Sequence, residues 1–223
     1  MSKKIITIDG PSASGKGTLA KNLAARLNFF YLDTGAIYRL LGLHLLNNGI
    51  DPDNPRACAA EASKFAAHFT PAMVDNPAIR NDFVADATSR SSKHPGVRMA
   101  LLDIQRNLAK NPPQPYRGSV LDGRDTGTVV CPDAPLKLFL TASPEIRAQR
   151  RTKELQSKGL DVTYEAVLQD LEARDTRDAS REVAPLRPAQ DAATVDTSDL
   201  DADAALEKVL EICLLYTSPS PRD

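Results

Sequence analysis

The sequence predicts an α/β protein built on a parallel sheet of about five strands flanked by helices. Short apolar runs of strand character alternate along the chain with segments whose apolar residues recur at helical spacing. The first run, Ile5–Ile8, is β-branched and indicates a strand buried on both faces, and a glycine-rich turn leads from it into a helical pattern. A chain of 223 residues is long enough for one large domain or for a domain with a sizeable insertion.

The individual elements follow from periodicity and from turn residues. The predicted strands are Ile5–Ile8, Phe29–Leu32, Val120–Leu121, Leu136–Leu140 and Ala193–Val195. Two N-terminal helices are predicted by the spacing of Leu19, Leu23, Ala24 and Leu27, and of Ile37, Leu40, Leu41 and Leu45, the second helix ending at Asn47-Asn48-Gly49. A last helix is expected over 204–212.

The segments between the strands divide the chain into a core and two long segments outside it. Alanine-rich helical stretches broken by prolines occupy about 52–115, which we expect to be an insertion between strands rather than a separate domain. The second long segment, from Ser143 to about Arg187, holds two helical stretches joined at Lys158-Gly159. The core therefore comprises 1–51 and 116–213. Residues 214–223 switch to Ser/Pro composition, and we expect a disordered tail or a segment foreign to the natural protein.

Composition excludes several classes of protein. The 28 Lys and Arg residues and 29 Asp and Glu residues give a net charge of −1, so no overall field attracts nucleic acid or an anionic membrane. The three cysteines are widely separated, which argues against a zinc site and indicates a reducing compartment. No stretch approaches the roughly 18 apolar residues of a membrane span. We expect a cytoplasmic monomer that binds neither nucleic acid nor membrane.

A phosphate-binding loop follows the first strand. The spacing Gly-x4-Gly-Lys is met by Gly10, Pro11, Ser12, Ala13, Ser14, Gly15, Lys16, Gly17 and Thr18. Glycines let backbone N–H groups curl around phosphate oxygens, the helix N-terminus adds positive potential, and Lys16 reaches the outer phosphates. Because Gly17 takes the place of the usual Ser or Thr, we expect Mg²⁺ to accompany ATP without direct protein ligation, or Thr18 to substitute. The loop alone leaves motor, GTPase and kinase open, but no Asn-Lys-x-Asp motif supports a GTPase.

Further motifs resemble those of the nucleoside monophosphate kinases, and among them the bacterial cytidylate kinase family. The phosphate loop is followed by LDTGAIYR at 32–39, and the family's order continues with LDGRDTGTVV at 121–130, SPEIRAQRR at 143–151 and EARDTRD at 172–178. The resemblance covers about 4–212 and implies a P-loop kinase fold, an acceptor-binding insertion at 52–115 and a lid near 147–187. The segment 69–83 departs from the family, because it is broken by prolines and lacks the glycine of a hairpin, so we expect a mostly helical insertion.

Clustered arginines suit a kinase that must gather two phosphate groups. Arg147, Arg150 and Arg151 fall at i, i+3 and i+4, so one helix face is predicted to present all three, and Arg174, Arg177 and Arg181 repeat the pattern. A solvated charged face is the ordinary explanation of such runs. Their place beside a glycine-containing turn after a strand favours a closing lid, with Lys16, Arg147, Arg150 and Arg151 as catalytic residues.

The resemblance also implies an acceptor site for CMP. It assigns Asp125 and Thr34 to the cytosine amino group and Arg98 to N3 and O2. It assigns Arg39, Arg124 and Arg181 to the α-phosphate, and Ser89, Arg174 and Asp178 to the ribose hydroxyls. The implied activity is phosphorylation of CMP, and of dCMP, by ATP through direct in-line transfer. Two alternatives stay open: a P-loop kinase for another acceptor such as UMP or a shikimate-like compound, and a regulatory nucleotide-binding module without transferase activity.

Overall fold

The computed structural model describes residues 4–217, and the side chains up to Leu214. Two compact units divide the described chain: the first holds the residues up to Leu32 and from Pro112 onward, and the second holds Asp33–Asn111. The described helices include none that is both long and apolar enough to cross a membrane.

The first unit is built on a five-stranded parallel sheet. Its strands are β1 (Lys4–Asp9), β2 (Phe30–Asp33), β3 (Gly118–Gly123), β4 (Leu136–Thr141) and β5 (Ala193–Asp196), in the order β2-β3-β1-β4-β5. Strand β1 pairs in parallel with both β3 and β4, and β4 pairs in parallel with β5. The predicted fold class and all five predicted strands are confirmed. Strand β1 is central, and because the strands are parallel, the loops after β1, β3 and β4 all begin at the carboxyl ends of the strands, where α/β proteins bind ligands.

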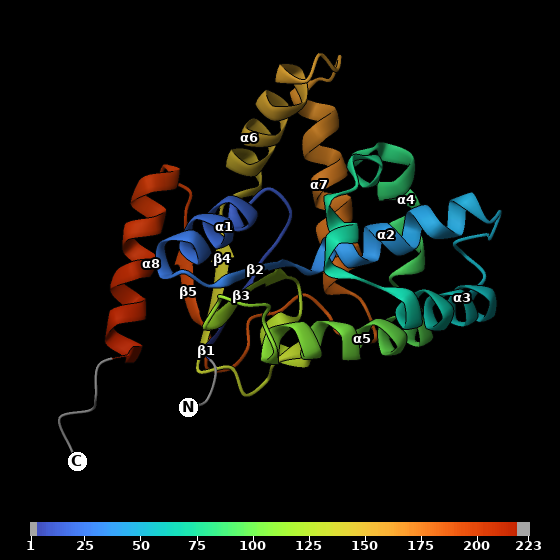
Figure 1. The fold of residues 1–223 in the computed structure, drawn as a ribbon. Helices are drawn as coiled ribbons and strands as arrows, with labels where there is room; N and C mark the ends of the chain where they lie inside the picture. Colours follow the sequence, from blue (N-terminus) through green and yellow to red (C-terminus); the bar gives the residue numbers. More distant parts are fainter. Residues whose placement is uncertain (1–3, 218–223) are drawn as a thin grey trace. The chain divides into compact units, whose positions relative to one another are not determined.

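Two helices cover one face of this sheet. Helix α1 (Lys16–Leu27) and helix α8 (Ala202–Thr217) lie side by side against it (Figure 1). Ile6 and Ile8 of β1 pack in one core cluster with Leu23 of α1 and Val209 of α8. The alternate residues of β1, Thr7 and Asp9, point to the opposite side, which carries the π-helical turn η3 (Thr126–Val130).

The predicted pair of helices after β4 is also confirmed. Helices α6 (Pro144–Ser157) and α7 (Tyr164–Ala179) pack along each other and form a hairpin that extends away from the sheet (Figure 1). Ala148, Val167 and Leu171 form the buried contact between them. The connection contains Gly159 at φ +79°, a left-handed conformation that favours glycine.

Helix α8 extends into the segment that sequence composition set apart as a tail. It runs through Thr217, beyond the expected end at 212, and Cys213 is buried in the core. The apolar run from Leu214 to Tyr216 prolongs the helix, a signal that the following Ser and Pro residues obscured. The rest of the expected tail, 218–223, lies outside the described residues.

The second unit is wholly helical, which confirms the expectation of a mostly helical insertion. It contains α2 (Thr34–Asn47), α3 (Pro55–His68), α4 (Asp82–Ser91) and α5 (Pro95–Lys110), and two 3₁₀ turns, η1 (Pro71–Asp75) and η2 (Pro77–Arg80). Asp33, Asn54 and Asn81 cap α2, α3 and α4, each accepting a hydrogen bond from the first turn. This unit includes α2, which precedes the insertion predicted at 52–115; that domain boundary stays a prediction.

Candidate active site

The loop between β1 and α1 has the backbone that phosphate binding requires. Gly10 (φ +157°) lies so close to β4 that a Cβ atom there would be 2.1 Å from the carbonyl oxygen of Leu140. Gly15 (φ +85°) stands at the N-cap of α1, and no side chain caps this helix. The N–H groups of the first helical turn and the positive end of the helix dipole are therefore suited to an anion.

The Lys16 side chain folds back onto the first part of the loop. Its side chain is buried, and Nζ donates a hydrogen bond to the carbonyl oxygen of Pro11 at 3.0 Å. This contact places the ammonium group inside the curve of the loop, where it would meet the outer phosphates of a nucleotide.

A cavity of about 410 Å³ opens beside the loop within the first unit. It is lined by the loop from Ala13 to Thr18, by Arg150, Arg151 and Glu154 of α6, and by the connection from β5 to α8, including Thr197 and Asp201. The volume falls within the range of small-molecule sites. The structure therefore brings Arg150 and Arg151 together with the phosphate loop, as the sequence predicted.

Arg147 does not share that position. Its side chain is buried, Nε donates to the carbonyl oxygen of Ala142 at 3.0 Å, and Nη1 donates to that of Ser12 at 3.2 Å. It does not line the cavity. The Arg147 guanidinium thus lies under the phosphate loop, and the catalytic role expected for it stays a prediction.

Arg150 and Arg151 differ in their own contacts. Arg150 donates to the hydroxyl of Thr197 at 3.2 Å and to the carbonyl oxygens of Thr197 and Leu200 at 2.6 and 3.1 Å. Arg151 forms an ion pair with Glu154 at 2.8 Å on the half-exposed side of α6. Arg150 is thus tied to the β5–α8 connection, whereas the ion pair of Arg151 lies within its own helix.

A second basic group surrounds Asp178 of α7. Arg124 Nε lies 3.1 Å from Asp178 Oδ2 and its Nη2 donates to Ser12 Oγ at 2.9 Å, while Arg181 contacts the other carboxylate oxygen. Burial raises the pKa of Asp178, but the charges of Arg124, Arg181 and Arg174 outweigh burial and hold its pKa below the usual value. Arg124 comes from the motif at 121–130 and the other three residues from the segment 172–181, and the structure brings these two segments together beside the loop.

Asp9 fixes the turn that carries Asp125. Its Oδ1 accepts hydrogen bonds from the amide and the hydroxyl of Thr126, and its Oδ2 from the amide of Gly127, all at 2.8 Å. Burial raises the pKa of Asp9 to about 6, the hydrogen bonds oppose this, and the charge of buried Asp125 adds to it. Sequence reasoning missed Asp9, although an aspartate that ends a buried strand directly before Gly10 was an available signal.

The second unit holds the other predicted acceptor residues. Asp33 caps α2 and its Oδ2 lies 3.7 Å from Arg39 and 3.5 Å from Arg80. Arg98 is buried on α5, with its guanidinium 5.4 Å from the centre of the Tyr38 ring. Thr34 is buried at the start of α2, and Ser89 is half-buried on α4.

One carboxylate could meet a magnesium ion beside the loop. A Cβ atom on Gly17 would lie 3.1 Å from Asp122 Oδ2, which also accepts a hydrogen bond from the Tyr31 hydroxyl at 3.4 Å. The described residues contain no cluster of three or more metal-ligating side chains. A single carboxylate fits Mg²⁺, which commonly keeps its waters and binds substrate phosphates. Sequence reasoning had not singled out Asp122.

The sheet order, the phosphate loop with its lysine and the arginine-bearing helical hairpin together define a P-loop kinase. A model of the family described as cytidylate kinase matches residues 6–214. The chain belongs to the cytidylate kinase family.

Named relatives agree with this assignment, and a solved structure shares the fold. The chain is 56% identical over 208 residues to "Cytidylate kinase" of Paramagnetospirillum magneticum and 49% identical over 208 residues to that of Rhodospirillum rubrum, covering 93% of this chain and 96% of each relative. Among solved structures, an uncharacterized protein from Eubacterium ventriosum has the same fold, with a TM-score of 0.53 at 15% identity over 94% of this chain and 98% of that chain.

Proposed function

We propose that this protein transfers the γ-phosphoryl group of ATP to CMP, and to dCMP, giving ADP and the cytidine diphosphate. The observation that carries the proposal is the phosphate loop, whose lysine is buried within its curve and which opens on a cavity lined by Arg150 and Arg151. Membership of the cytidylate kinase family supports CMP as the acceptor, and named relatives at 49–56% identity support it further.

The transfer needs charge and positioning more than acid–base chemistry. An oxygen of the CMP phosphate attacks the γ-phosphorus while the bond to the β-phosphate oxygen breaks, and the acceptor is already ionised at neutral pH. Lys16 and the amides of the α1 N-terminus would hold the ATP phosphates. Arg150 and Arg151 would stabilise the charge of the transferring group, and Arg147 would hold the loop through Ser12.

The roles in CMP recognition come from family resemblance and are given for each unit by itself. In the first unit, Arg124 and Arg181 would bind the α-phosphate, Arg174 and Asp178 the ribose, and Asp125 the cytosine amino group. In the second unit, Arg39 would bind the α-phosphate, Ser89 the ribose, Arg98 the base at N3 and O2, and Thr34 the amino group. A buried carboxylate such as Asp125 would accept from the amino group of cytosine and repel the O4 of uracil.

Mg²⁺ would accompany ATP and neutralise charge on its phosphates. Asp122, whose Oδ2 adjoins Gly17, is the residue that would hold the ion, directly or through its waters. A monomeric cytoplasmic enzyme remains our expectation.

An acceptor panel tests the proposal. The purified protein, ATP and Mg²⁺ are combined with CMP, dCMP, UMP, AMP and shikimate, and formation of ADP and of the phosphorylated acceptor is measured. We expect the largest kcat/KM with CMP and dCMP. A clear preference for another acceptor would replace the proposed substrate, and ATP binding without transfer to any acceptor would favour a regulatory module.

A further inference from the structure

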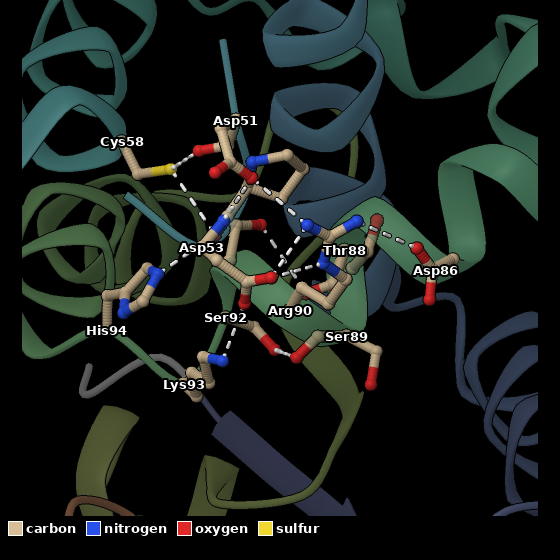
Figure 2. Close-up of polar contacts among 12 residues, drawn as sticks. Asp51, Asp53, Cys58, Asp86, Thr88, Ser89, Arg90, Ser92, Lys93 and His94 are labelled. Atoms are coloured by element: carbon tan, nitrogen blue, oxygen red, sulfur yellow. Dashed lines mark hydrogen bonds and ion pairs between the residues drawn. The ribbon is translucent and has the colours of Figure 1, made fainter. Parts of the chain in front are cut away.

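A network of charged side chains joins two distant segments of the second unit. We call Asp51, Asp53, Arg90 and Lys93 the charged clamp. Arg90 Nε donates to Asp53 Oδ2 at 2.8 Å, and its Nη2 lies 2.6 Å from the same oxygen and 3.0 Å from Asp51 Oδ1. Lys93 Nζ donates to Asp53 Oδ1 at 2.7 Å (Figure 2). The clamp thus binds the loop before α3 to the end of α4.

Side chains on both sides of this junction contact backbone carbonyl oxygens of the loop 51–53. Buried His94, at the N-cap of α5, lies with Nε2 2.9 Å from the carbonyl oxygen of Pro52. On the other side, the Cys58 thiol of α3 lies within hydrogen-bond distance of the carbonyl oxygens of Asp51 and Pro52, at 3.4 and 3.5 Å. The loop 51–53 is therefore anchored on α3, and the clamp ties the α4–α5 turn to this anchor.

Two residues proposed to contact CMP depend on the position of that turn. Ser89 directly precedes Arg90 on α4, and in Figure 2 its side chain points away from the clamp. Ser92 Oγ lies 3.5 Å from the carbonyl oxygen of Ser89, and Arg98 Nη1 donates to the carbonyl oxygen of Ser92 at 3.2 Å. A shift of the turn 91–94 would move both Ser89 and the Arg98 guanidinium.

Isolated ion pairs at a protein surface contribute little to stability, but in this network Arg90 and Asp53 each have more than one charged partner. Three carboxylates converge on one guanidinium, and Asp53 receives hydrogen bonds on both of its oxygens. The hydrogen bonds from Lys93 and Arg90 lower the pKa of Asp53 to about 2. Because the Arg90 guanidinium donates through Nε to Asp53, through Nη2 to Asp51 and through Nη1 to Asp86, the network restricts orientation as well as distance.

We propose that Arg90 and Asp53 are positioning residues for the acceptor nucleotide: the charged clamp holds the α4–α5 turn where Ser89 and Arg98 can meet the ribose and the base of CMP. This inference rests on the proposed function. It assigns no contact between the clamp and the nucleotide, and it predicts that the clamp acts on binding of CMP and not on binding of ATP.

The chain offers a matched pair of variants to test this. Asp53 and Asp86 both pair with Arg90, but Asp86 lies on α4 itself, four residues before Arg90, and its pair at 3.3 Å cannot tie α4 to the loop. Asp53→Asn and Asp86→Asn make the same chemical change. Each is measured for kcat, for the KM of CMP and of ATP, and for melting temperature.

We expect Asp53→Asn and Arg90→Gln to raise the KM for CMP about three- to ten-fold, while the KM for ATP and kcat stay within about two-fold of the wild type. Asp86→Asn should leave all three unchanged. Arg90→Lys, which keeps the charge but loses the planar fork, should show an intermediate KM for CMP. The double variant Arg90→Gln/Asp53→Asn should raise the KM for CMP at least as much as either single variant, because Asp53→Asn leaves the Arg90–Asp51 pair in place and Arg90→Gln leaves the Lys93–Asp53 pair.

Several outcomes overturn the inference. One is an unchanged KM for CMP in whichever of the Asp53 and Arg90 variants folds, and another is an equal rise in Asp53→Asn and Asp86→Asn. A parallel rise in the KM for ATP would show a general loss of structure. Failure of the proposed function is seen separately, as absence of CMP phosphorylation by the wild-type protein, and it would remove the inference as well.

Discussion

Arg147 of α6 and Asp175 of α7 join the two helices of the hairpin through an ion pair in which Nη1 lies 2.6 Å from Oδ2. The same guanidinium donates to the carbonyl oxygens of Ala142 and Ser12, so one buried side chain connects α6, α7, the end of β4 and the phosphate loop. Arg147 therefore links the hairpin directly to the phosphate loop.

Replacing Arg147 should lower stability as well as activity. Arg147→Met removes a buried cation and leaves the partly buried Asp175 without its ion pair, which we expect to cost about 2–4 kcal/mol of unfolding free energy. Urea denaturation measures this loss. Arg151→Met is the matched control, since its ion pair with Glu154 is largely exposed, and its stability should change by less than about 0.5 kcal/mol. Equal losses in the two variants would contradict the buried role of Arg147.

Lys16→Ala should remove most phosphoryl transfer without unfolding the protein. The Lys16 side chain contacts the carbonyl oxygen of Pro11 and takes no part in the apolar core, so the fold should tolerate its loss. Losing a charge that stabilises the transferring group should cost about 3–5 kcal/mol, a fall in kcat of roughly 10²–10⁴-fold. Lys21→Ala, on the exposed side of the same helix, should retain full activity. A folded Lys16→Ala enzyme with near-normal turnover would refute the role given to the loop.

Most of the fold could be predicted from the sequence because its signals are local. The five strands are short apolar runs, the phosphate loop is one contiguous motif, and the turn between α6 and α7 was indicated by Gly159. Local patterns also placed α1 and α2, but they ended the last helix at 212, whereas the apolar residues of α8 continue into the C-terminal segment and the helix runs through Thr217.

The partners of the site residues could not be predicted in the same way. Asp9 and Thr126 lie 117 positions apart, and Arg90 and Asp53 lie 37 apart, so no periodicity relates them. The spacing of Arg147, Arg150 and Arg151 predicts a shared helix face but not their partners: Arg147 contacts Ser12 and Asp175, whereas Arg150 contacts Thr197. The CMP-contacting roles, which came from family resemblance, remain predictions.

The raised pKa of Asp9 gives a pH dependence with a definite sign. The pKa of Asp9 is raised from the ordinary value of 3.8 to about 6 in the folded protein, so the folded state binds the proton more tightly than the unfolded state. The contribution of Asp9 to stability is therefore fully present below the ordinary pKa and is lost as pH rises through the folded-state pKa. Asp9→Asn removes the titration and sets an amide N–H₂ against a backbone donor of the turn, which should destabilise the protein by about 1–3 kcal/mol at pH 7.5.

The difference in unfolding free energy between wild type and Asp9→Asn should therefore be larger at pH 5.0 than at pH 7.5, by about 1 kcal/mol. Urea denaturation of both proteins at the two pH values measures it. A difference that grows toward pH 7.5 would mean that the hydrogen bonds from Thr126 and Gly127 outweigh burial and lower the pKa instead.

Asp125→Ala tests the choice of substrate. The backbone carbonyl oxygen of Asp125 accepts from the amides of Val129 and Val130, and alanine keeps these bonds, so the turn should hold its shape. Loss of the carboxylate would leave the cytosine amino group without its acceptor, and kcat/KM for CMP should fall about 10²-fold. The loss for UMP should be much smaller, because UMP does not form that bond and is freed from a repulsion.

The quantity to measure is the ratio of kcat/KM for CMP to that for UMP in wild type, Asp125→Ala and Asp125→Asn. An asparagine side chain can accept from an amino group or donate to O4, so its ratio should fall between those of the other two proteins. Burial is the main cause of the raised pKa of Asp9, and the charge of Asp125 raises it further, so both variants should relieve this repulsion and neither should lose much stability. An equal drop in kcat/KM for the two nucleotides would show that Asp125 maintains the turn and does not discriminate between the bases.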